Sequence, residues 1–142
     1  MKIRGKVIPG KGWASGFLKI QLPMISAEFP EIGHCHPGTL NLQLETNLLV
    51  LAPDYRTKPI NWHPALASGE VFDFLRIKLE APEGSALIAA WLYIAHTSPH
   101  RAMFCVHEVL APKITAPVGM PCAIHVERAV LPYGQGPLVV VL

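Results

Sequence analysis

Closely spaced prolines and glycines constrain this chain more than any other feature of its sequence. Its 142 residues include 14 prolines and 11 glycines, and few windows free of both are long enough for a substantial helix. The stretches between these breaks are rich in Val, Ile, Leu and Phe, which favour extended chain. The sequence therefore predicts short strands joined by turns, with one or two short helices at most.

The clearest predicted strand is 39–44, in which three leucines alternate with Asn41 and Gln43. That period of two is typical of a half-buried strand. Because strands and helices do not alternate, the elements predict an all-β domain shaped as a small closed or nearly closed barrel. Further strands are expected over 3–8, 15–22, 71–79, 86–95, 103–110 and 122–127, with a short helix over 23–29 and a long excursion, or flap, over 53–69. The tail, 138–142, is expected either to pair along the edge of a sheet or to be mobile.

Composition and charge limit the classes of function. Half of the residues are apolar and 15% are charged, which indicates a single folded domain over 1–142. A net charge of +2 is too small to indicate nucleic acid or an anionic membrane as the partner. The start of the chain lacks the apolar stretch of a signal peptide, and the longest apolar run, 86–95, is about half the length that crosses a bilayer. Three widely spaced cysteines do not form a disulfide framework, so we expect a soluble protein of the reducing cytoplasm.

A glycine-rich segment lies between the first two predicted strands. Glycines there let backbone N–H groups converge on an anion, and a lysine can add a charge-assisted contact. The simpler interpretation is a hairpin turn. Because a strand is predicted to follow, the segment matches neither a Walker loop nor a Rossmann fingerprint. Its residues are Gly10, Lys11, Gly12, Trp13, Ala14, Ser15 and Gly16.

Thr39 and Asn41 lie two residues apart at the start of a predicted strand, so their side chains leave on one face. A hydroxyl and an amide carbonyl are oxygen ligands suited to Mg²⁺, which also takes waters and phosphate oxygens. The alternative is a Pro-Gly turn followed by an ordinary strand.

Two further groups of residues carry possible chemistry. Glu108 is an acid within an apolar strand, and it either points to solvent or faces a pocket and accepts hydrogen bonds from a ligand. His34 and His36 share one side of an extended loop, where they are candidate ligands of a transition metal. Surface or hydrogen-bonded histidines are the simpler interpretation. Partners for such a metal site would come from Cys35, His63, His96, His100 and His107.

Taken together and in this order, these segments resemble the archaeal CTP-dependent riboflavin kinases. That family combines a Gly-x-Gly loop after the first strand, a Gly-Thr-Leu-Asn strand and a later acidic segment ending in Ala-Pro. The resemblance covers most of residues 3–127 and is weakest over 53–69. The matching pieces are Gly5-x-Val7, Gly10-x-Gly12, Phe17-Leu18, Pro37-Gly38-Thr39-Leu40-Asn41-Leu42 and Glu108-Val109-Leu110-Ala111-Pro112.

The resemblance implies a six-stranded cradle-loop barrel of the riboflavin-synthase-like kind. It implies transfer of the CTP γ-phosphate to the 5′-hydroxyl of riboflavin, giving FMN and CDP. By position, residues 10–16 would hold the nucleotide phosphates, Thr39 and Asn41 would bind Mg²⁺, and Glu108 would contact the flavin or its ribityl chain. The phosphate-accepting end would be held by Thr97 or Ser98, and the cytosine would lie against Pro112, Lys113, Ile114 and Thr115.

Some residues depart from the family pattern. Trp13 and Ala14 replace an acidic residue and a glycine of the loop, and Lys113 begins a segment where the family has Leu-Arg. These departures favour a second hypothesis, a non-catalytic domain that binds a flavin or nucleotide without transferring phosphate. A third is a metal-dependent enzyme centred on His34 and His36.

Overall fold

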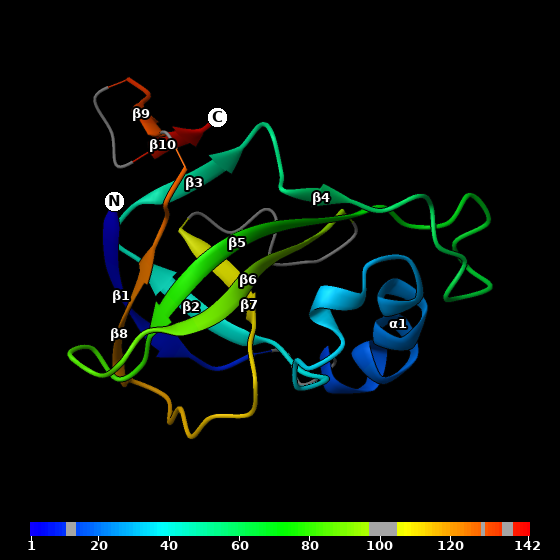
Figure 1. Cartoon of the computed structure of the whole chain (residues 1–142), viewed down its shortest axis with the longest axis horizontal. Helices are drawn as coiled ribbons and strands as arrows, with labels where there is room; N and C mark the ends of the chain where they lie inside the picture. Colours follow the sequence, from blue (N-terminus) through cyan, green and yellow to red (C-terminus); the bar gives the residue numbers. More distant parts are fainter. Residues whose placement is uncertain (11–13, 97–104, 129, 135–137) are drawn as a thin grey trace.

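The computed structural model describes residues 1–10, 14–96, 105–128, 130–134 and 138–142. Strand is the most abundant secondary structure in this part of the chain, as the sequence predicts, and it is accompanied by one long helix (Figure 1). The helices are α1 (Ala14–Glu28) and the short 3-10 helix η1 (Pro30–Ile32). The strands are β1 (Lys2–Ile8), β2 (Leu40–Leu44), β3 (Asn47–Val50), β4 (Tyr55–Arg56), β5 (Phe72–Glu80), β6 (Ile88–Ala95), β7 (Val106–Leu110), β8 (Pro121–His125), β9 (Val130–Pro132) and β10 (Leu138–Val141).

Seven of these strands form an antiparallel sheet in the order β4-β5-β6-β7-β2-β1-β8. A further pairing joins β5 to β8, with Leu79 opposite Ile124. Hydrogen bonding therefore runs in a ring through six strands, and β4 extends it at the edge of β5. The ring gives every strand an inside and an outside face.

Aliphatic side chains from all six strands fill the inside of the ring. On β2, Leu42 and Leu44 belong to this inner cluster, while the alternate residues Asn41 and Gln43 face the other way. The alternation predicted over 39–44 is therefore confirmed. Other members of the cluster are Ile3, Val7, Leu75, Ile77, Leu79, Leu92, Val109 and Ile124.

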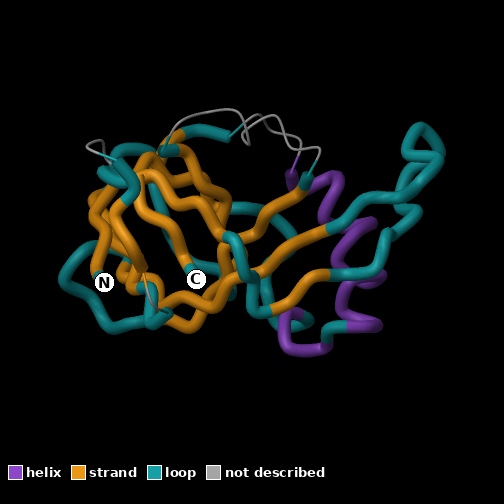
Figure 2. The backbone as a smooth tube through the Cα atoms, turned by 90° about the horizontal axis from the view of Figure 1, so that it is seen from above, coloured by secondary structure: helices purple, strands orange, loops and turns teal. Residues whose placement is uncertain are grey.

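Helix α1 covers part of the outside of the ring, beside the ends of β5 and β6 (Figures 1 and 2). Four apolar side chains of α1 and the residue after it, Leu18, Leu22, Ile25 and Phe29, form a second buried cluster with the strands. Their partners on the strands are Phe72, Phe74, Trp91, Tyr93, Ala95 and Leu110. Among the helices of the described residues, none is long and apolar enough to cross a membrane.

The prediction of a strand over 15–22 is wrong, because α1 runs through it and through the short helix expected over 23–29. Two effects compete in this segment. A proline inside a helix, here the exposed Pro23, costs about 3 kcal/mol. Burial of four large apolar side chains at helical spacing contributes about 1.5–3 kcal/mol each, so packing outweighs the proline.

The other predicted strands are confirmed, with ends that shift by one to three residues. Residues 103 and 104 of the expected 103–110 strand lie outside the described residues. Strands β3, β4 and β9 were not predicted. The tail 138–142 is not mobile but forms β10, which lies between β3 and β9 and pairs in parallel with β3.

Strands β3, β10 and β9 form a separate three-stranded sheet, the small sheet, in which β9 runs antiparallel to β10. One face of the small sheet packs against the ring, because Leu48, Val139 and Val141 belong to the inner cluster. The small sheet therefore extends the core of the ring.

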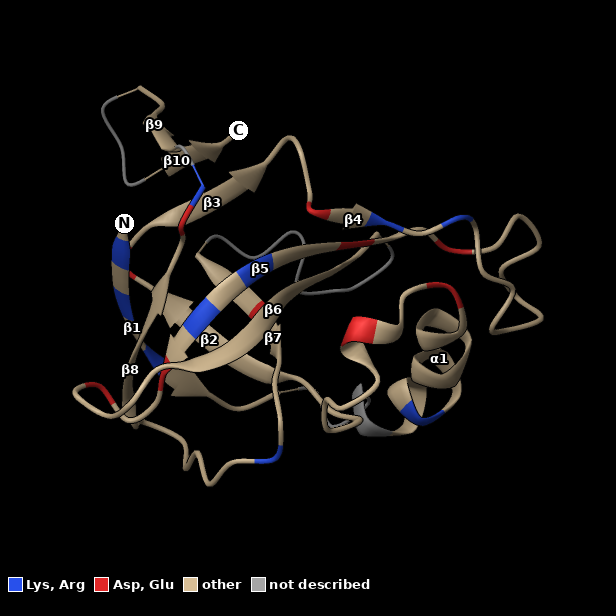
Figure 3. Ribbon diagram, in the orientation of Figure 1, with Lys and Arg blue, Asp and Glu red and all other residues tan. Residues whose placement is uncertain are grey.

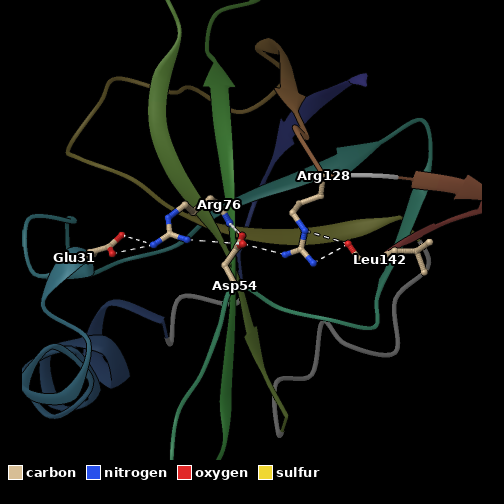
Figure 4. A network of polar contacts seen from close by, with 5 residues as sticks. All are labelled: Glu31, Asp54, Arg76, Arg128 and Leu142. Carbon is tan, nitrogen blue, oxygen red and sulfur yellow. Dashed lines mark hydrogen bonds and ion pairs between the residues drawn. The ribbon is translucent and has the colours of Figure 1, made fainter.

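Two arginines link the small sheet, the ring and η1 (Figure 4). Arg128, three residues after β8, donates to the main-chain oxygen of Leu142 from Nε and Nη2 at 3.0 and 2.7 Å, and to Asp54 Oδ1 from Nη1 at 2.9 Å. Arg76 of β5 lies 3.8 Å from the same Asp54 oxygen, and its Nη2 donates to both carboxylate oxygens of Glu31 at 2.8 Å. These contacts hold the end of β10 against the ring.

A partly buried histidine, His107 of β7, links the small sheet to the ring. Nε2 of His107 accepts a hydrogen bond from the main-chain N–H of Leu48 at 3.3 Å. Burial lowers the pKa of His107 from 6.5 to about 4, because an apolar surrounding disfavours the charged ring. The folded protein therefore holds this histidine neutral under conditions in which the unfolded chain protonates it.

We expect this histidine to make stability fall as pH drops. The contribution of the neutral ring is complete above pH 6.5 and is lost as pH falls from 6.5 towards 4, since only the unfolded chain binds the proton in that range. Between pH 7 and pH 5 the loss should be about 1–2 kcal/mol. Urea unfolding at the two pH values measures it. The fall in the free energy of unfolding should be smaller in His107→Gln than in the wild type. The control His34→Gln, a change at an exposed histidine, should show the same fall as the wild type. Equal falls in all three proteins would contradict the assignment of this pH dependence to His107.

Candidate functional site

Three polar side chains lie side by side on the outside of the ring. Asn41 of β2 is paired with Glu108 of β7, and Glu108 is paired in turn with Tyr93 of β6. Cross-strand partners share one face of a sheet, so the three form a polar row across β2, β7 and β6. On its other side, Asn41 is paired with Ile8 near the end of β1.

Thr39, directly before β2, contacts this row. Its hydroxyl Oγ1 lies 3.4 Å from Oε1 of Glu108, as a donor to the carboxylate. Thr39, Asn41 and Glu108, which the sequence analysis selected separately, are therefore brought together. Thr39 and Glu108 are both partly exposed.

Asn41 carries an unsatisfied acceptor. Its side chain is only 6% exposed, and among the described residues Oδ1 has no hydrogen-bond partner. A buried polar atom left unpaired costs about 1–3 kcal/mol, and buried side-chain oxygens in native proteins usually have a partner. The oxygen is suited to a bound donor or cation.

Helix α1 is attached to the polar row through a buried hydrogen bond. The Tyr93 hydroxyl donates to Oε1 of Gln21 at 2.6 Å, and Gln21 is 2% exposed. Burial, and then the nearby charges of Glu108 and Glu70, raise the pKa of Tyr93 far above its ordinary value. Tyr93 therefore remains a neutral donor, and it fixes α1 over the row.

The glycine-rich segment begins next to the row, since Gly10 follows Ile8, the strand partner of Asn41, by two residues. Lys11, Gly12 and Trp13 lie outside the described residues. Helix α1 starts at Ala14 and includes Ser15 and the exposed Gly16. The expectation that a strand follows the segment is wrong, so the segment leads into a helix N-terminus, where backbone N–H groups lack intrahelical partners.

The segment expected to contact cytosine lies at the same end of the ring. The main-chain oxygen of Ala111, just before Pro112, accepts a hydrogen bond from the N–H of His36 at 2.8 Å, which joins it to the loop that precedes Thr39. Further along, Gly119 and Met120 bond to Val7 of β1. Of the expected contact residues, Lys113 and Thr115 are exposed, whereas Pro112 and Ile114 are partly buried. The expected acceptor-side residues Thr97 and Ser98 lie outside the described residues.

The described histidines do not gather into a metal site. The Cys35 side chain is buried in the cluster under α1, and burial raises its pKa to about 11, while His34 and His36 are exposed. Within residues 1–10, 14–96, 105–128, 130–134 and 138–142, no group of three or more His, Cys, Asp and Glu side chains could hold a metal ion. His63, His96, His107 and His125 each have another partner: the N–H of Ala65, the carboxylate of Asp73, the N–H of Leu48 and the carboxylate of Glu80.

The base of the 53–69 excursion is fixed against the rest of the molecule. Strand β4 pairs with β5, and Ile60 forms an isolated bridge with Glu70. Trp62 donates from Nε1 to Oε1 of the buried Glu70 at 2.8 Å, and its ring lies 5.1 Å from that of Phe17 on α1. The excursion therefore contacts the helix that covers the polar row.

Gln21 and Tyr93 were not among the residues predicted from the sequence. Gln21 lies between Ile20 and Leu22, and Tyr93 lies within the long apolar run of β6. A polar atom in such a position needs a partner when it is buried, and that requirement was the signal available.

No protein-family model matches the chain, and no curated protein sequence matches it.

Proposed function

We propose that this chain is a riboflavin kinase-like phosphotransferase, which moves the γ-phosphate of CTP to the 5′-hydroxyl of riboflavin and gives FMN and CDP. The proposed architecture is the six-stranded cradle-loop barrel of that family. One observation carries the proposal: the buried Oδ1 of Asn41, which has no hydrogen-bond partner in the described part of the chain, lies in a row with Glu108, which Thr39 contacts. The resemblance selects these three residues from two segments far apart in the sequence.

The oxygen atoms of the row fit Mg²⁺. Oδ1 of Asn41 is an uncommitted acceptor, and Oγ1 of Thr39 is a second neutral oxygen on the same side. Mg²⁺ needs only one or two protein oxygens when phosphate oxygens and waters complete its octahedron. When bound there it would neutralise charge on the transferring phosphoryl group.

The surroundings of Asn41 also fit a triphosphate. The strand beside it, β1, ends two residues before Gly10, and the chain then enters the N-terminus of α1. Free N–H groups and the helix dipole favour phosphate at such a junction. Residues 10–16 and the segment 112–115 would then flank the nucleotide.

Glu108 is the proposed contact for the acceptor. Its carboxylate already accepts a hydrogen bond from Thr39, and it would accept one from a ribityl hydroxyl and orient it towards the phosphate. Phosphoryl transfer depends chiefly on such positioning and on charge neutralisation. No covalent nucleophile is required.

Incubation of the purified chain with riboflavin, Mg²⁺ and each nucleoside triphosphate tests the proposal. FMN should form, fastest with CTP, and chelation of Mg²⁺ should stop it. Chromatography with mass detection measures FMN and the nucleoside diphosphate. Failure to form FMN with any triphosphate would contradict the proposal, and riboflavin binding without FMN would favour the non-catalytic alternative.

A pair of threonine variants tests whether FMN formation depends on the polar row. Thr39→Val should reduce the rate of FMN formation by about 100-fold, the usual effect of removing one group that stabilises the transition state. Thr46→Val, a matched change beyond the opposite end of β2, should retain the wild-type rate. Equal rates in the two variants would place the chemistry elsewhere.

A further inference from the structure

The small sheet is apolar on both of its faces. Leu49 of β3, Val140 of β10 and Leu131 of β9 are partners in register and so share its outer face. The alternate residues of the three strands, among them Leu48 and Val139, pack against the inner cluster. On this outer face Leu49 and Leu131 are 46% and 54% exposed, whereas Val140 between them is 8% exposed.

The exposed part of this outer face is large. Its large side chains retain roughly half of their accessible surface: Leu49 46%, Leu51 59%, Leu131 54%, Tyr133 63% and Leu142 44%. At roughly 200 Å² for a large residue, these exposed fractions correspond to about 550 Å² of mostly apolar surface. That is near the upper limit of about 600 Å² for the largest patch on a typical monomer.

Two features of the sheet indicate that this face is covered in the assembled protein. Strands β3 and β10 pair in parallel, a pairing found mostly in sheets with both faces covered. Their sequences, 47–52 and 138–142, are continuous apolar runs after Asn47, the pattern of doubly buried strands rather than the alternation of a sheet with one solvated face.

The absence of charged residues from the strands of the small sheet indicates which kind of partner its outer face can bind. The segments 47–53, 130–134 and 138–142 contain no charged residue, and β3, β9 and β10 carry neither of the charge colours in Figure 3. An uncharged face offers nothing to attract nucleic acid or an acidic or basic protein. It does not repel a second copy of itself.

We propose that two copies of this chain pair through the outer faces of their small sheets, as a dimer with twofold symmetry. Pairing of identical patches about a twofold axis is the commonest form of oligomer. Two patches together bury about 1,100 Å², close to the lower end for specific interfaces. Two sheets packed face to face also complete the double burial that the strand sequences require. This pairing is independent of the proposed transfer reaction.

Sedimentation of the full chain over a range of concentrations tests the pairing. We expect a monomer–dimer equilibrium that shifts to monomer at low concentration. Leu131→Lys should give a monomer at all concentrations, because it places two charges in the apolar interface. The control Leu87→Lys, 52% exposed in the turn between β5 and β6, should dimerise like the wild type.

Circular dichroism of each variant establishes that it is folded. If Leu131→Lys does not fold, Tyr133→Ser is used in its place and should also be monomeric. Tyr133 is 63% exposed, and loss of its side chain leaves the strands intact. A wild-type chain that is monomeric throughout would overturn the proposal. Dimers that persist in the folded small-sheet variants, or association that continues beyond two copies, would also overturn it.

Discussion

Replacing Asn41 with leucine is expected to reduce the rate of FMN formation by about 100-fold or more, without destabilising the fold. The two effects have one origin, the unpartnered Oδ1 of Asn41. Leucine removes the proposed Mg²⁺ ligand and also removes a buried polar atom that costs about 1–3 kcal/mol. The free energy of urea unfolding should therefore stay constant or rise by about 1 kcal/mol, while the rate measured by FMN chromatography falls.

Two further variants make this result specific. Asn41→Asp keeps an oxygen ligand but buries a charge, so it should retain transfer in Mg²⁺ and lose stability without it. Asn61→Leu, an equivalent change at an exposed position in the 53–69 excursion, should leave the rate unchanged. FMN formation at the wild-type rate by Asn41→Leu would refute the metal assignment.

Replacing Gly5 with alanine is expected to cause the largest loss of stability of any change considered, about 3 kcal/mol or more. Gly5 lies in β1 between its partners Leu44 of β2 and Cys122 of β8. A Cβ at this position would overlap the main-chain oxygen of Gln43 and lie 2.9 Å from Cδ2 and 3.0 Å from Cα of Leu44. Because two of these contacts, including the closest, are with backbone atoms, β1 and β2 would have to separate.

A matched glycine provides the control. A Cβ added at Gly16 of α1 would meet nothing within 4 Å, and alanine is favoured over glycine inside a helix by about 1 kcal/mol. Thermal or urea unfolding should therefore show Gly5→Ala strongly destabilised and Gly16→Ala slightly stabilised. A loss of less than about 1 kcal/mol in Gly5→Ala would mean that β1 and β2 are not packed as closely as described.

Strands of the ring could be predicted where the sequence pattern depends only on residues close together in the chain. The alternation of leucines in β2 depends on residues two apart, and the structure confirms it. Helix α1 was missed because Gly16 and Pro23 are poor helix formers, whereas its stability comes from contacts of Leu18, Leu22 and Ile25 with distant strands. Tertiary packing overrode local preference there.

The remaining differences between the sequence predictions and the structure come from pairing between strands that lie far apart in the chain. The parallel pair that aligns Asn47 with Leu138 has no local signature, so β3 was missed and β10 was expected without its partner. For the site, the residue types of Asn41 and Glu108 were visible in the sequence. Their adjacency depends on the register of β2 against β7, which strand composition does not determine.

A crystal structure with CDP, FMN and Mn²⁺ in place of Mg²⁺ is the most direct measurement, because anomalous scattering locates the metal without reference to turnover. Mn²⁺ should be bonded to the side-chain oxygens of Asn41 and Thr39 and to a phosphate oxygen, and the ribityl chain should lie at Glu108. A metal or nucleotide bound away from the polar row, with Asn41 Oδ1 still unpartnered, would contradict this assignment.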